Sequence, residues 1–184
     1  LSGSNTYGGN TTVDGGVLTQ TLPNANAGLA NSSIIMNTGG TFAIPNDAAL
    51  GTENLVFQGG TLRFNGYTSQ HNFTNLANLA LGAANGTAST LGNATAGTGV
   101  ITGSKGLIYN GPGTLTLAAN NSFSGQTVVN AGTLIQSLPD NNSNITINAG
   151  AFFGIPNDAA LGSENITWNT GTLEFLTYNT TLNF

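Results

Sequence analysis

An eight-residue segment occurs twice in this chain, letter for letter, and it constrains the fold more than any other feature. Residues 44–51 read Ile-Pro-Asn-Asp-Ala-Ala-Leu-Gly, and residues 155–162 repeat them 111 positions later. An identity of this length does not arise by chance within 184 residues. The chain is therefore built from copies of one unit, which favours an architecture that grows by repetition. We call the two copies the first octet and the second octet.

The similarity extends well beyond the octets. Residues 60–64 match residues 171–175 at the same offset. Upstream the offset becomes 116, so that residues 1–9 match residues 117–125. The five-residue difference falls around Asn26 to Ser32, where we expect a surface loop, because surface loops tolerate insertions.

These matches predict one domain with internal repetition. The expected arrangement is a single β-solenoid segment over residues 1–184, with a full unit at 1–116 and a partial second unit at 117–184. Glycines that precede short apolar strands recur about every 20 residues, which is typical of a solenoid of β-coils. At this spacing we predict an all-β fold, a parallel β-helix of eight or nine coils. Neither end of the sequence carries an identifiable cap.

The predicted strands alternate between apolar and polar residues. Ile145 and Ile147 share one face of their strand, and Leu115 and Leu117 share one face of theirs. Thr and Asn occupy the opposite faces, so one side of each strand is expected in the core and the other in solvent. Residues 74–92 fit a helix or a strand, and the solenoid context favours the strand. Stacked asparagines are expected to form hydrogen-bonded ladders.

The octet itself reads as a corner of the solenoid. Its proline lacks an N–H group and fits poorly in a central ladder. The Asn-Asp pair, the helix-forming Ala-Ala-Leu and the final glycine resemble one capped helical turn. We expect Leu50 and Leu161 to point inward and the Asp to bind free backbone amides. The predicted structural corner caps are Asn46, Asp47, Gly51, Asn157, Asp158 and Gly162.

Charge and composition exclude several classes of function. Only 5% of the residues are charged, the net charge is −5, and Arg63 and Lys105 are the two basic residues. Nucleic-acid binding needs clustered basic residues, so it is not expected, and neither is binding to anionic lipid. There is no cysteine for a disulfide or a thiolate site. No apolar run approaches the ~20 residues of a membrane helix, so no membrane insertion is expected in this segment.

Two stretches carry a resemblance to a known family. Residues 113–134, Gly-Thr-Leu-Thr-Leu-Ala-Ala-Asn-Asn-Ser-Phe-Ser-Gly-Gln-Thr-Val-Val-Asn-Ala-Gly-Thr-Leu, resemble the autotransporter-associated β-strand repeat, also called the passenger-associated transport repeat. Residues 1–18 are similar to the same repeat. The resemblance implies a right-handed parallel β-helix in a large secreted or surface-anchored bacterial protein. The family motif is structural, and it brings no catalytic residues or cofactors.

The acidic residues leave three interpretations open. Asp47 and Glu53 occupy the same positions in the first unit as Asp158 and Glu164 in the second. Some β-helices cleave glycans with clustered carboxylates, but an enzyme needs one site rather than two copies. Structural capping is favoured, with a weak calcium or glycan contact, or catalysis, as alternatives. His71 aligns with Leu182, so we expect neither a histidine metal site nor a Ser-His-Asp triad.

The remaining polar and aromatic residues point to structure rather than chemistry. Arg63 aligns with Glu174, and this reversal of charge indicates a position that faces water. Trp168 aligns with Phe57, and Tyr7 aligns with Phe123. We therefore expect most aromatic side chains to pack in the core or at corners, with a sugar-binding platform as the alternative.

We therefore predict a non-enzymatic structural segment of an extracellular or surface-exposed bacterial fibre or stalk. An adhesin passenger that binds a host or glycan ligand is the alternative, and a glycan-active enzyme is disfavoured. The expected partners are further repeats of the same chain, or copies that assemble end to end or side by side.

Overall fold

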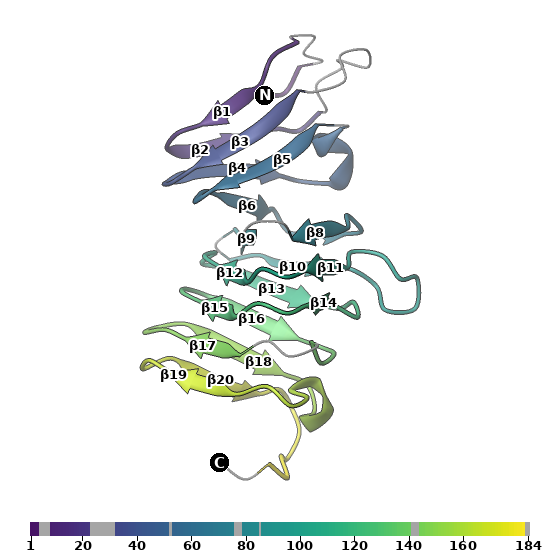
Figure 1. Ribbon diagram of the computed structural model, residues 1–184, viewed down its shortest axis with the longest axis vertical. Helices are drawn as coiled ribbons and strands as arrows, with labels where there is room; N and C mark the ends of the chain where they lie inside the picture. The colour runs from purple at the N-terminus through teal and green to yellow at the C-terminus, as the bar shows by residue number, and fades with distance from the viewer. Residues whose placement is uncertain are drawn as a thin grey trace.

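The computed structural model describes residues 1–3, 8–22, 32–51, 53–75, 79–84, 86–140 and 144–182. These residues form a stack of short coils with the two termini at opposite ends (Figure 1). Every strand pair is parallel and joins one coil to the next. The fold is thus an all-β parallel solenoid, as predicted. It makes about seven turns, rather than the eight or nine that we expected.

An eight-stranded sheet runs along the whole stack and forms its longest side. Because its strands come from successive coils, it gives seven steps from one coil to the next. The strands, in spatial order, are β2 (Gly16–Thr19), β4 (Gly40–Ile44), β6 (Thr61–Phe64), β9 (Leu79–Ala83), β12 (Leu107–Tyr109), β15 (Thr127–Val129), β17 (Ile145–Ile147) and β19 (Ile166–Trp168).

A six-stranded sheet forms the second side. Each of its strands directly follows a strand of the eight-stranded sheet along the chain. The strands are β7 (Thr68–Ser69), β10 (Ala88–Leu91), β13 (Thr114–Leu117), β16 (Thr133–Gln136), β18 (Phe152–Ile155) and β20 (Thr172–Phe175).

The third side consists of two separate three-stranded sheets. Each of their strands precedes a strand of the eight-stranded sheet along the chain. The first contains β1 (Thr11–Val13), β3 (Ser33–Asn37) and β5 (Asn54–Gln58), and the second contains β8 (Phe73–Asn75), β11 (Ile101–Gly103) and β14 (Ser122–Phe123). Two 3₁₀ turns, η1 (Asp47–Leu50) and η2 (Asp158–Ala160), complete the elements.

Within residues 74–92 the described part contains strands, as the solenoid context favoured over a helix. β9 and β10 lie within this range, and β8 ends inside it at Asn75. Residues 76–78 and 85 lie outside the described part of the chain. No α-helix occurs among the described residues. None of these residues forms a helix long and apolar enough to cross a membrane.

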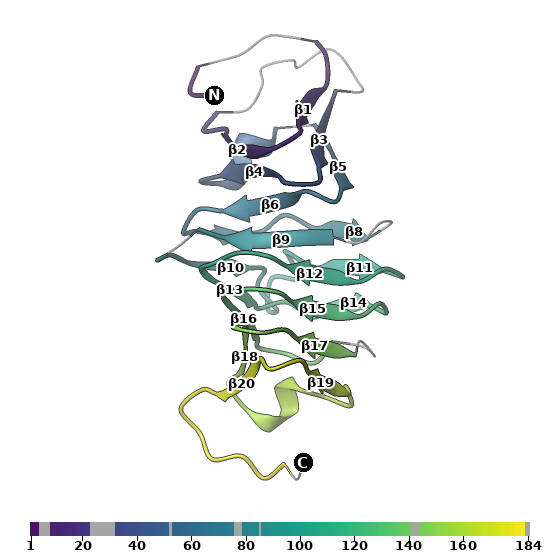
Figure 2. The same ribbon diagram turned by 90° about the vertical axis from the view of Figure 1, so that its left-hand side faces the viewer.

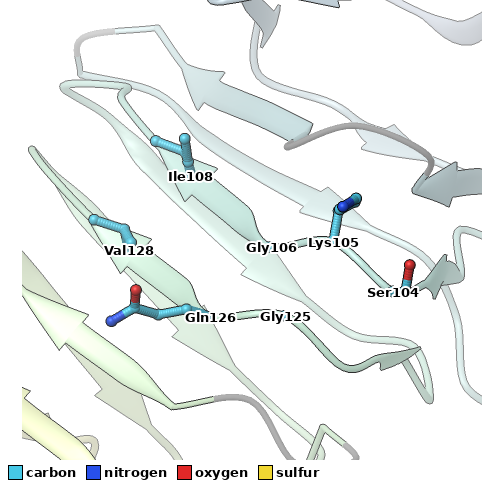
Figure 3. A pocket seen from close by; sticks show the side chains of 7 residues that line it. All are labelled: Ser104, Lys105, Gly106, Ile108, Gly125, Gln126 and Val128. Carbon is cyan, nitrogen blue, oxygen red and sulfur yellow. The ribbon is translucent and has the colours of Figure 1, made fainter.

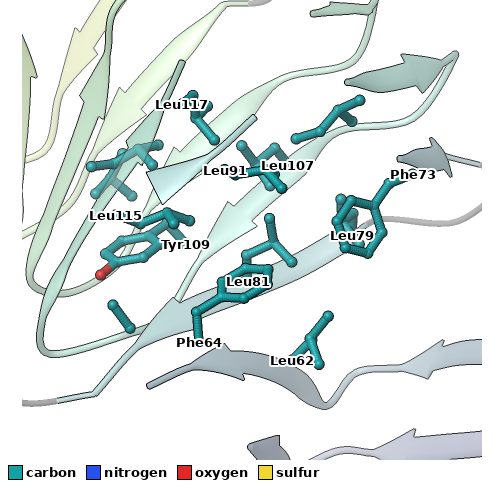
Figure 4. Close-up of a cluster of buried hydrophobic side chains, with 14 of the residues drawn as sticks. Leu62, Phe64, Phe73, Leu79, Leu81, Leu91, Leu107, Tyr109, Leu115 and Leu117 are labelled. Carbon is teal, nitrogen blue, oxygen red and sulfur yellow. The ribbon is translucent and has the colours of Figure 1, made fainter. Parts of the chain in front are cut away.

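The core is made of columns of apolar side chains that stack from coil to coil. Parallel pairing without a shift in register places each inward side chain on its counterpart in the next coil. The longest column follows the eight-stranded sheet, and Figure 4 shows part of it. Its members are Leu18, Phe42, Leu62, Leu81, Tyr109, Val129, Ile147 and Trp168. A single coil buries its inward residues only against neighbouring coils, so the stack is stable only as a whole.

A ladder of asparagine side chains runs along one edge of the eight-stranded sheet. Asn110, Asn130, Asn148 and Asn169 each directly follow a strand of this sheet. The Nδ2 group of Asn130 donates to Oδ1 of Asn110 at 2.8 Å. Asn148 donates to Asn130 at 2.6 Å, and Asn169 donates to Asn148 at 3.0 Å. The expected asparagine ladder is therefore present, and it aligns four successive coils at one corner.

The two octets follow strands that belong to different sheets. The first octet follows β4 in the eight-stranded sheet, whereas the second follows β18 in the six-stranded sheet. Likewise β3 lies in a three-stranded sheet, and its sequence counterpart β17 lies in the eight-stranded sheet. A unit with a whole number of coils would return every strand to the same sheet. The 111-residue offset therefore corresponds to five coils and one further side.

Candidate functional site

Each octet forms a tight 3₁₀ turn whose first amides are capped by asparagine. Oδ1 of Asn46 accepts a hydrogen bond from the N–H of Ala49 at 3.1 Å, and Asn157 accepts from Ala160 at 3.1 Å. Both asparagines have extended backbone conformations, as N-cap residues do. The asparagine, rather than the aspartate, thus binds the amides of its own turn.

Both octets end on a glycine in the left-handed region. Gly51 has φ 60° and Gly162 has φ 61°. This region is costly for side chains with a Cβ atom, so it suits glycine at the end of a turn. Leu50 and Leu161 are 2% and 6% exposed, and they point into the core as expected.

Asp47 binds the coil that follows it rather than its own turn. Its Oδ2 atom accepts a hydrogen bond from the backbone N–H of Gln70 at 2.6 Å. Its Oδ1 atom accepts from the hydroxyl of Ser69 at 2.6 Å and from the hydroxyl of Tyr67 at 3.0 Å. Burial, followed by the charge of Asp47, raises the pKa of the Tyr67 hydroxyl, which therefore stays a donor. One carboxylate thus joins two successive coils.

Asp158 makes the equivalent contacts in the second unit. Its Oδ1 accepts from the hydroxyl of Thr180 at 2.7 Å. Its Oδ2 accepts from the N–H of Thr181 at 2.8 Å and from the Thr181 hydroxyl at 2.7 Å. The hydrogen bonds from Thr181 and Thr180 lower the pKa of Asp158 to about 2. Thr180 and Thr181 occupy the positions of Ser69 and Gln70, so the arrangement recurs with different donors.

A buried glutamine binds each octet from the preceding coil. Nε2 of Gln20 donates to the carbonyl oxygen of Ala49 at 2.7 Å, and Nε2 of Gln136 donates to that of Ala160 at 2.8 Å. Both glutamines are 0% exposed. The sequence reasoning missed them, although the signal was present, since Gln20 and Gln136 are identical at the 116-residue offset.

The octet corner therefore connects three successive coils. The glutamine reaches it from the coil before, and the aspartate reaches from it to the coil after. We propose that the six residues predicted as corner caps serve in this way, with the asparagines and glycines shaping the turn and the aspartates joining the coils. The same set recurs at two corners, which supports a structural role over a single reactive centre.

Two acidic side chains lie behind the second octet, of which Asp140 is buried and Glu164 is half-buried. Nε2 of Gln136 donates to both carboxylate oxygens of Glu164 at 3.0 Å, and the N–H of Asp140 donates to Glu164 Oε1 at 3.2 Å. Asp140 is 3% exposed, and its carboxylate oxygens accept no hydrogen bond in the described part of the chain. Burial raises the pKa of Asp140 to about 7, an increase that the nearby Asn121 side chain moderates. Burial, and then the charge of Asp140, raises the pKa of Glu164 to about 8.

His71 and Ser69 lie near Asp47 but do not form a catalytic triad. The Ser69 hydroxyl donates to Asp47 and accepts from the backbone N–H of His71 at 3.3 Å. The His71 ring packs edge-on against Phe73, with 4.8 Å between ring centroids. Burial lowers the pKa of His71, and the nearby negative charge of Asp47 partly offsets this decrease. Leu182 and Thr180 take the positions of His71 and Ser69 in the second unit, so this pair of side chains is not repeated there.

The aromatic residues divide between core and surface. Tyr109 and Phe123 are fully buried, and the Tyr109 hydroxyl donates to the carbonyl oxygen of Gly113 at 2.8 Å. Trp168 is 44% exposed, although it belongs to an inward column, because it lies in the last described coil. It borders a hollow of about 400 Å³ together with Leu161 and Leu182. Tyr7 lies outside the described residues, as do residues 26–31 of the expected surface loop.

A second hollow lies on the outer face of the eight-stranded sheet. It has a volume of about 320 Å³, and Ile108 and Val128 form its apolar floor. Figure 3 shows Lys105, Ser104 and Gln126 around it. Lys105 is exposed, whereas Arg63, which was expected to face water, is half-buried and donates through Nε to Asn65 Oδ1 at 3.3 Å. Within the described ranges, no three His, Cys, Asp or Glu side chains are grouped closely enough to hold a metal ion.

The model of the passenger-associated transport repeat matches residues 1–19 and 107–135. The second match covers β12, β13, β14 and β15 and extends into β16. The chain therefore carries the autotransporter passenger repeat, and these repeats form successive coils of a parallel β-solenoid.

The chain is also similar to a named autotransporter. It is 39% identical over 138 residues to the "Adhesin BmaC autotransporter" of Brucella suis biovar 1 (strain 1330). The match covers 71% of this chain but only 3% of that protein. No solved structure matches the chain. The repeat and the relative place the chain outside the cell or at the cell surface.

Proposed function

We propose that the chain is a rigid structural segment of a large surface passenger, which projects or links other parts of that protein. The single observation that carries this proposal is the uninterrupted eight-stranded sheet, whose inward column passes through every coil. A stack in which each coil is held to both neighbours resists bending and local unfolding. The proposal includes a right-handed path, as the family resemblance implies, and assigns no enzymatic activity.

The corner contacts support the same proposal. At both octets, buried or half-buried polar groups hold three coils together, and their donors are side chains and backbone amides of the chain itself. A carboxylate that is already saturated by such donors has little capacity left for a substrate. Asp47 and Asp158 therefore fit a structural role better than a catalytic one.

A replacement experiment in the parent passenger tests the proposal. The segment is replaced with an unrelated β-solenoid of equal length, and in a second variant with a Gly/Ser linker of equal residue number. For a scaffold, we expect adhesion and the height of the passenger above the cell to survive the first replacement and to fall with the second. Loss of adhesion with an unchanged height in the first variant would contradict the structural role.

The hollow beneath Lys105 favours a second candidate, in which the segment itself binds a ligand. Its apolar floor and its polar rim of Ser104, Lys105 and Gln126 fit one saccharide unit with an acidic group. The Brucella relative is named as an adhesin. A glycan array with the wild-type chain and a Lys105→Ala variant tests this candidate. Binding of acidic glycans that is lost in the variant would support it, and an empty array would reject it.

A further inference from the structure

The corner behind the second octet has more hydrogen-bond acceptors than donors. Figure 2 shows this octet as the light-green turn near the C-terminal end of the stack, and η2 lies within it. Three buried oxygen atoms near the turn accept no hydrogen bond within the described part of the chain, namely Oε1 of Gln136 and both carboxylate oxygens of Asp140. Gln136 is 0% exposed and Asp140 is 3% exposed, so these atoms are also withdrawn from solvent. Buried acceptors without a partner are costly, which points to a missing donor or cation.

Half-buried Glu164 brings these oxygen atoms together. Its carboxylate accepts from Nε2 of Gln136 at 3.0 Å on both oxygens, and from the N–H of Asp140 at 3.2 Å on Oε1. Nε2 and Oε1 of Gln136 are bonded to the same carbon atom, so the unpaired Oε1 lies close to the Glu164 carboxylate. Burial, and then the charge of Asp140, raises the pKa of Glu164, so the two carboxylates are close enough to repel each other. We call Gln136, Asp140 and Glu164 the acidic corner.

No basic side chain balances the charge of the acidic corner. The chain has two basic residues, of which Arg63 belongs to β6 and Lys105 lines the hollow over Ile108 and Val128. Neither of them contributes to the pKa shift of either carboxyl group. Burial raises the pKa of Asp140, and the Asn121 side chain nearby moderates this increase without a hydrogen bond of normal geometry. Buried carboxylates are ordinarily paired with a basic group or bound to a metal ion.

The first octet provides an internal comparison. Gln20 and Glu53 occupy the positions of Gln136 and Glu164, but Asn24 stands in the position of Asp140. Asn24 itself lies outside the described residues. Because Gln20 binds its octet as Gln136 does, the corner is built in the same way with a neutral residue at this position. The second carboxylate is therefore not needed to form the corner, and its burial beside Glu164 has a cost that a bound cation would offset.

We propose that the acidic corner is a binding site for a calcium ion, with the carboxylates of Asp140 and Glu164 and the Oε1 atom of Gln136 as its protein ligands. Ca²⁺ takes oxygen ligands in irregular arrangements, whereas Mg²⁺ requires a near-ideal octahedron and most transition metals favour nitrogen or sulfur. The site has two carboxylates and one amide oxygen, so it differs from a group of three acidic or histidine side chains, which the described ranges lack. The ion joins β16 to the coil that contains the second octet, independently of the hollow beneath Lys105.

Thermal melts of the full chain at pH 9 test the site with calcium ions as the probe. This pH lies above the pKa of both carboxyl groups, so protons compete little with the ion. With so few charged ligands, we expect a dissociation constant of about 0.1–1 mM, as in extracellular calcium modules. Relative to EDTA, 10 mM CaCl₂ should then raise the ratio of folded to unfolded chain at least about tenfold, and the melting temperature by at least about 3 °C. MgCl₂ at the same concentration should have a much smaller effect, and calorimetric titration should show one calcium ion per chain.

Two matched substitutions locate the ion. Asp140→Asn gives the second corner the composition of the first and removes one ligand with almost no change in volume. This variant should fold, because it relieves a buried charge, and in EDTA at pH 9 it should melt at or above the wild-type temperature. It should nevertheless lose the response to calcium. Glu53→Gln makes the equivalent loss of charge at the first octet, and it should keep the wild-type response.

Four results would overturn the proposal. The first is a wild-type melting temperature that calcium does not change, which would mean that water or protons alone serve the unpaired oxygens. The second is an equal effect of magnesium, which would indicate general screening of charge. The third is a calcium response that persists in Asp140→Asn, and the fourth is a response that Glu53→Gln abolishes, which would place the ion at the first octet.

Discussion

Asp47 accepts a hydrogen bond from the backbone N–H of Gln70 across the boundary between two coils, at 2.6 Å. The two residues are 23 positions apart in sequence, yet they are direct neighbours along the solenoid axis. The same carboxylate also accepts from Ser69 and Tyr67. Such a contact ties the position of a corner to the strand beneath it, so its removal should loosen two coils together.

We predict that Asp47→Ala destabilises the chain by about 3 kcal/mol, because three hydrogen bonds to the Asp47 carboxylate are lost, two of them at half-buried sites. Urea unfolding followed by circular dichroism measures the change. Asp14→Ala is the matched control, since Asp14 is exposed and accepts one hydrogen bond from Asn37. The control should stay within ~0.5 kcal/mol of wild type. Equal effects of the two substitutions would show that Asp47 does not join the coils.

We predict a comparable loss for Gln136→Met. This change removes the buried donor to the carbonyl oxygen of Ala160 and to Glu164, while it keeps a similar volume. A buried acceptor without a donor costs about 1–3 kcal/mol. The same unfolding measurement applies, with Gln126→Met as the control, since Gln126 is exposed and bonds to Thr146. An unchanged midpoint in Gln136→Met would argue against the three-coil corner.

Much of the fold could be predicted from the sequence, because repetition and alternation are local signals. The 20-residue rhythm predicted the parallel solenoid, and the alternation at Ile145 and Ile147 identified fully buried positions. The number of turns was overestimated because the glycine spacing does not account for longer coils. One such coil separates β9 from β12, where the turn around Asn93 and Thr98 is inserted.

The site was harder to predict, because its partners lie one coil away. Asp47 was expected to bind amides, but the sequence could not identify Gln70 as the donor without the register of β7 beneath η1. Gln20 and Gln136 have no local pattern that marks them as buried. Only their identity at the 116-residue offset distinguishes them from surface glutamines. The change of sheet between the two octets depends on the length of every coil between them.

Buried Asp140 and half-buried Glu164 together predict that the stability of the chain decreases as the pH rises. Their pKa values in the folded chain, about 7 and about 8, lie above those of ordinary carboxyl groups, so the folded state binds more protons than the unfolded state. The favourable contribution is therefore complete below about pH 4 and is lost as the pH rises through 7 to 8. We expect a loss of roughly 1–3 kcal/mol between pH 5 and pH 9, with allowance for solvent screening.

Thermal melts at pH 5, 7 and 9 test this dependence. The Asp140→Asn/Glu164→Gln double variant should have a flatter pH profile, whereas Glu174→Gln, at an exposed position, should keep the wild-type profile. Asp158 acts in the opposite direction. Its lowered pKa means that its contribution is present at neutral pH and is lost as the pH falls from about 4 toward 2. A wild-type chain that is most stable at pH 9 would contradict the assignment.

The last prediction concerns the unit itself, whose length is not a whole number of coils. An additional copy of residues 45–155, inserted after Ile155, creates only junctions that already occur in the chain, because Ile155 precedes a proline as Ile44 does. The inserted residues continue the solenoid from the side on which Ile155 ends. Each coil that follows therefore keeps its strands in register with those of the neighbouring coils. We expect a folded chain that is about 25 Å longer, from five to six coils at ~4.8 Å each. Small-angle scattering measures the maximum dimension.

An insert of residues 45–140 at the same place is the control. It joins Asp140 to Pro156 partway through a coil, so the strands that follow lose their register and the melting temperature should fall. Equal stability of the two inserts would mean that residues 45–155 are not the structural unit.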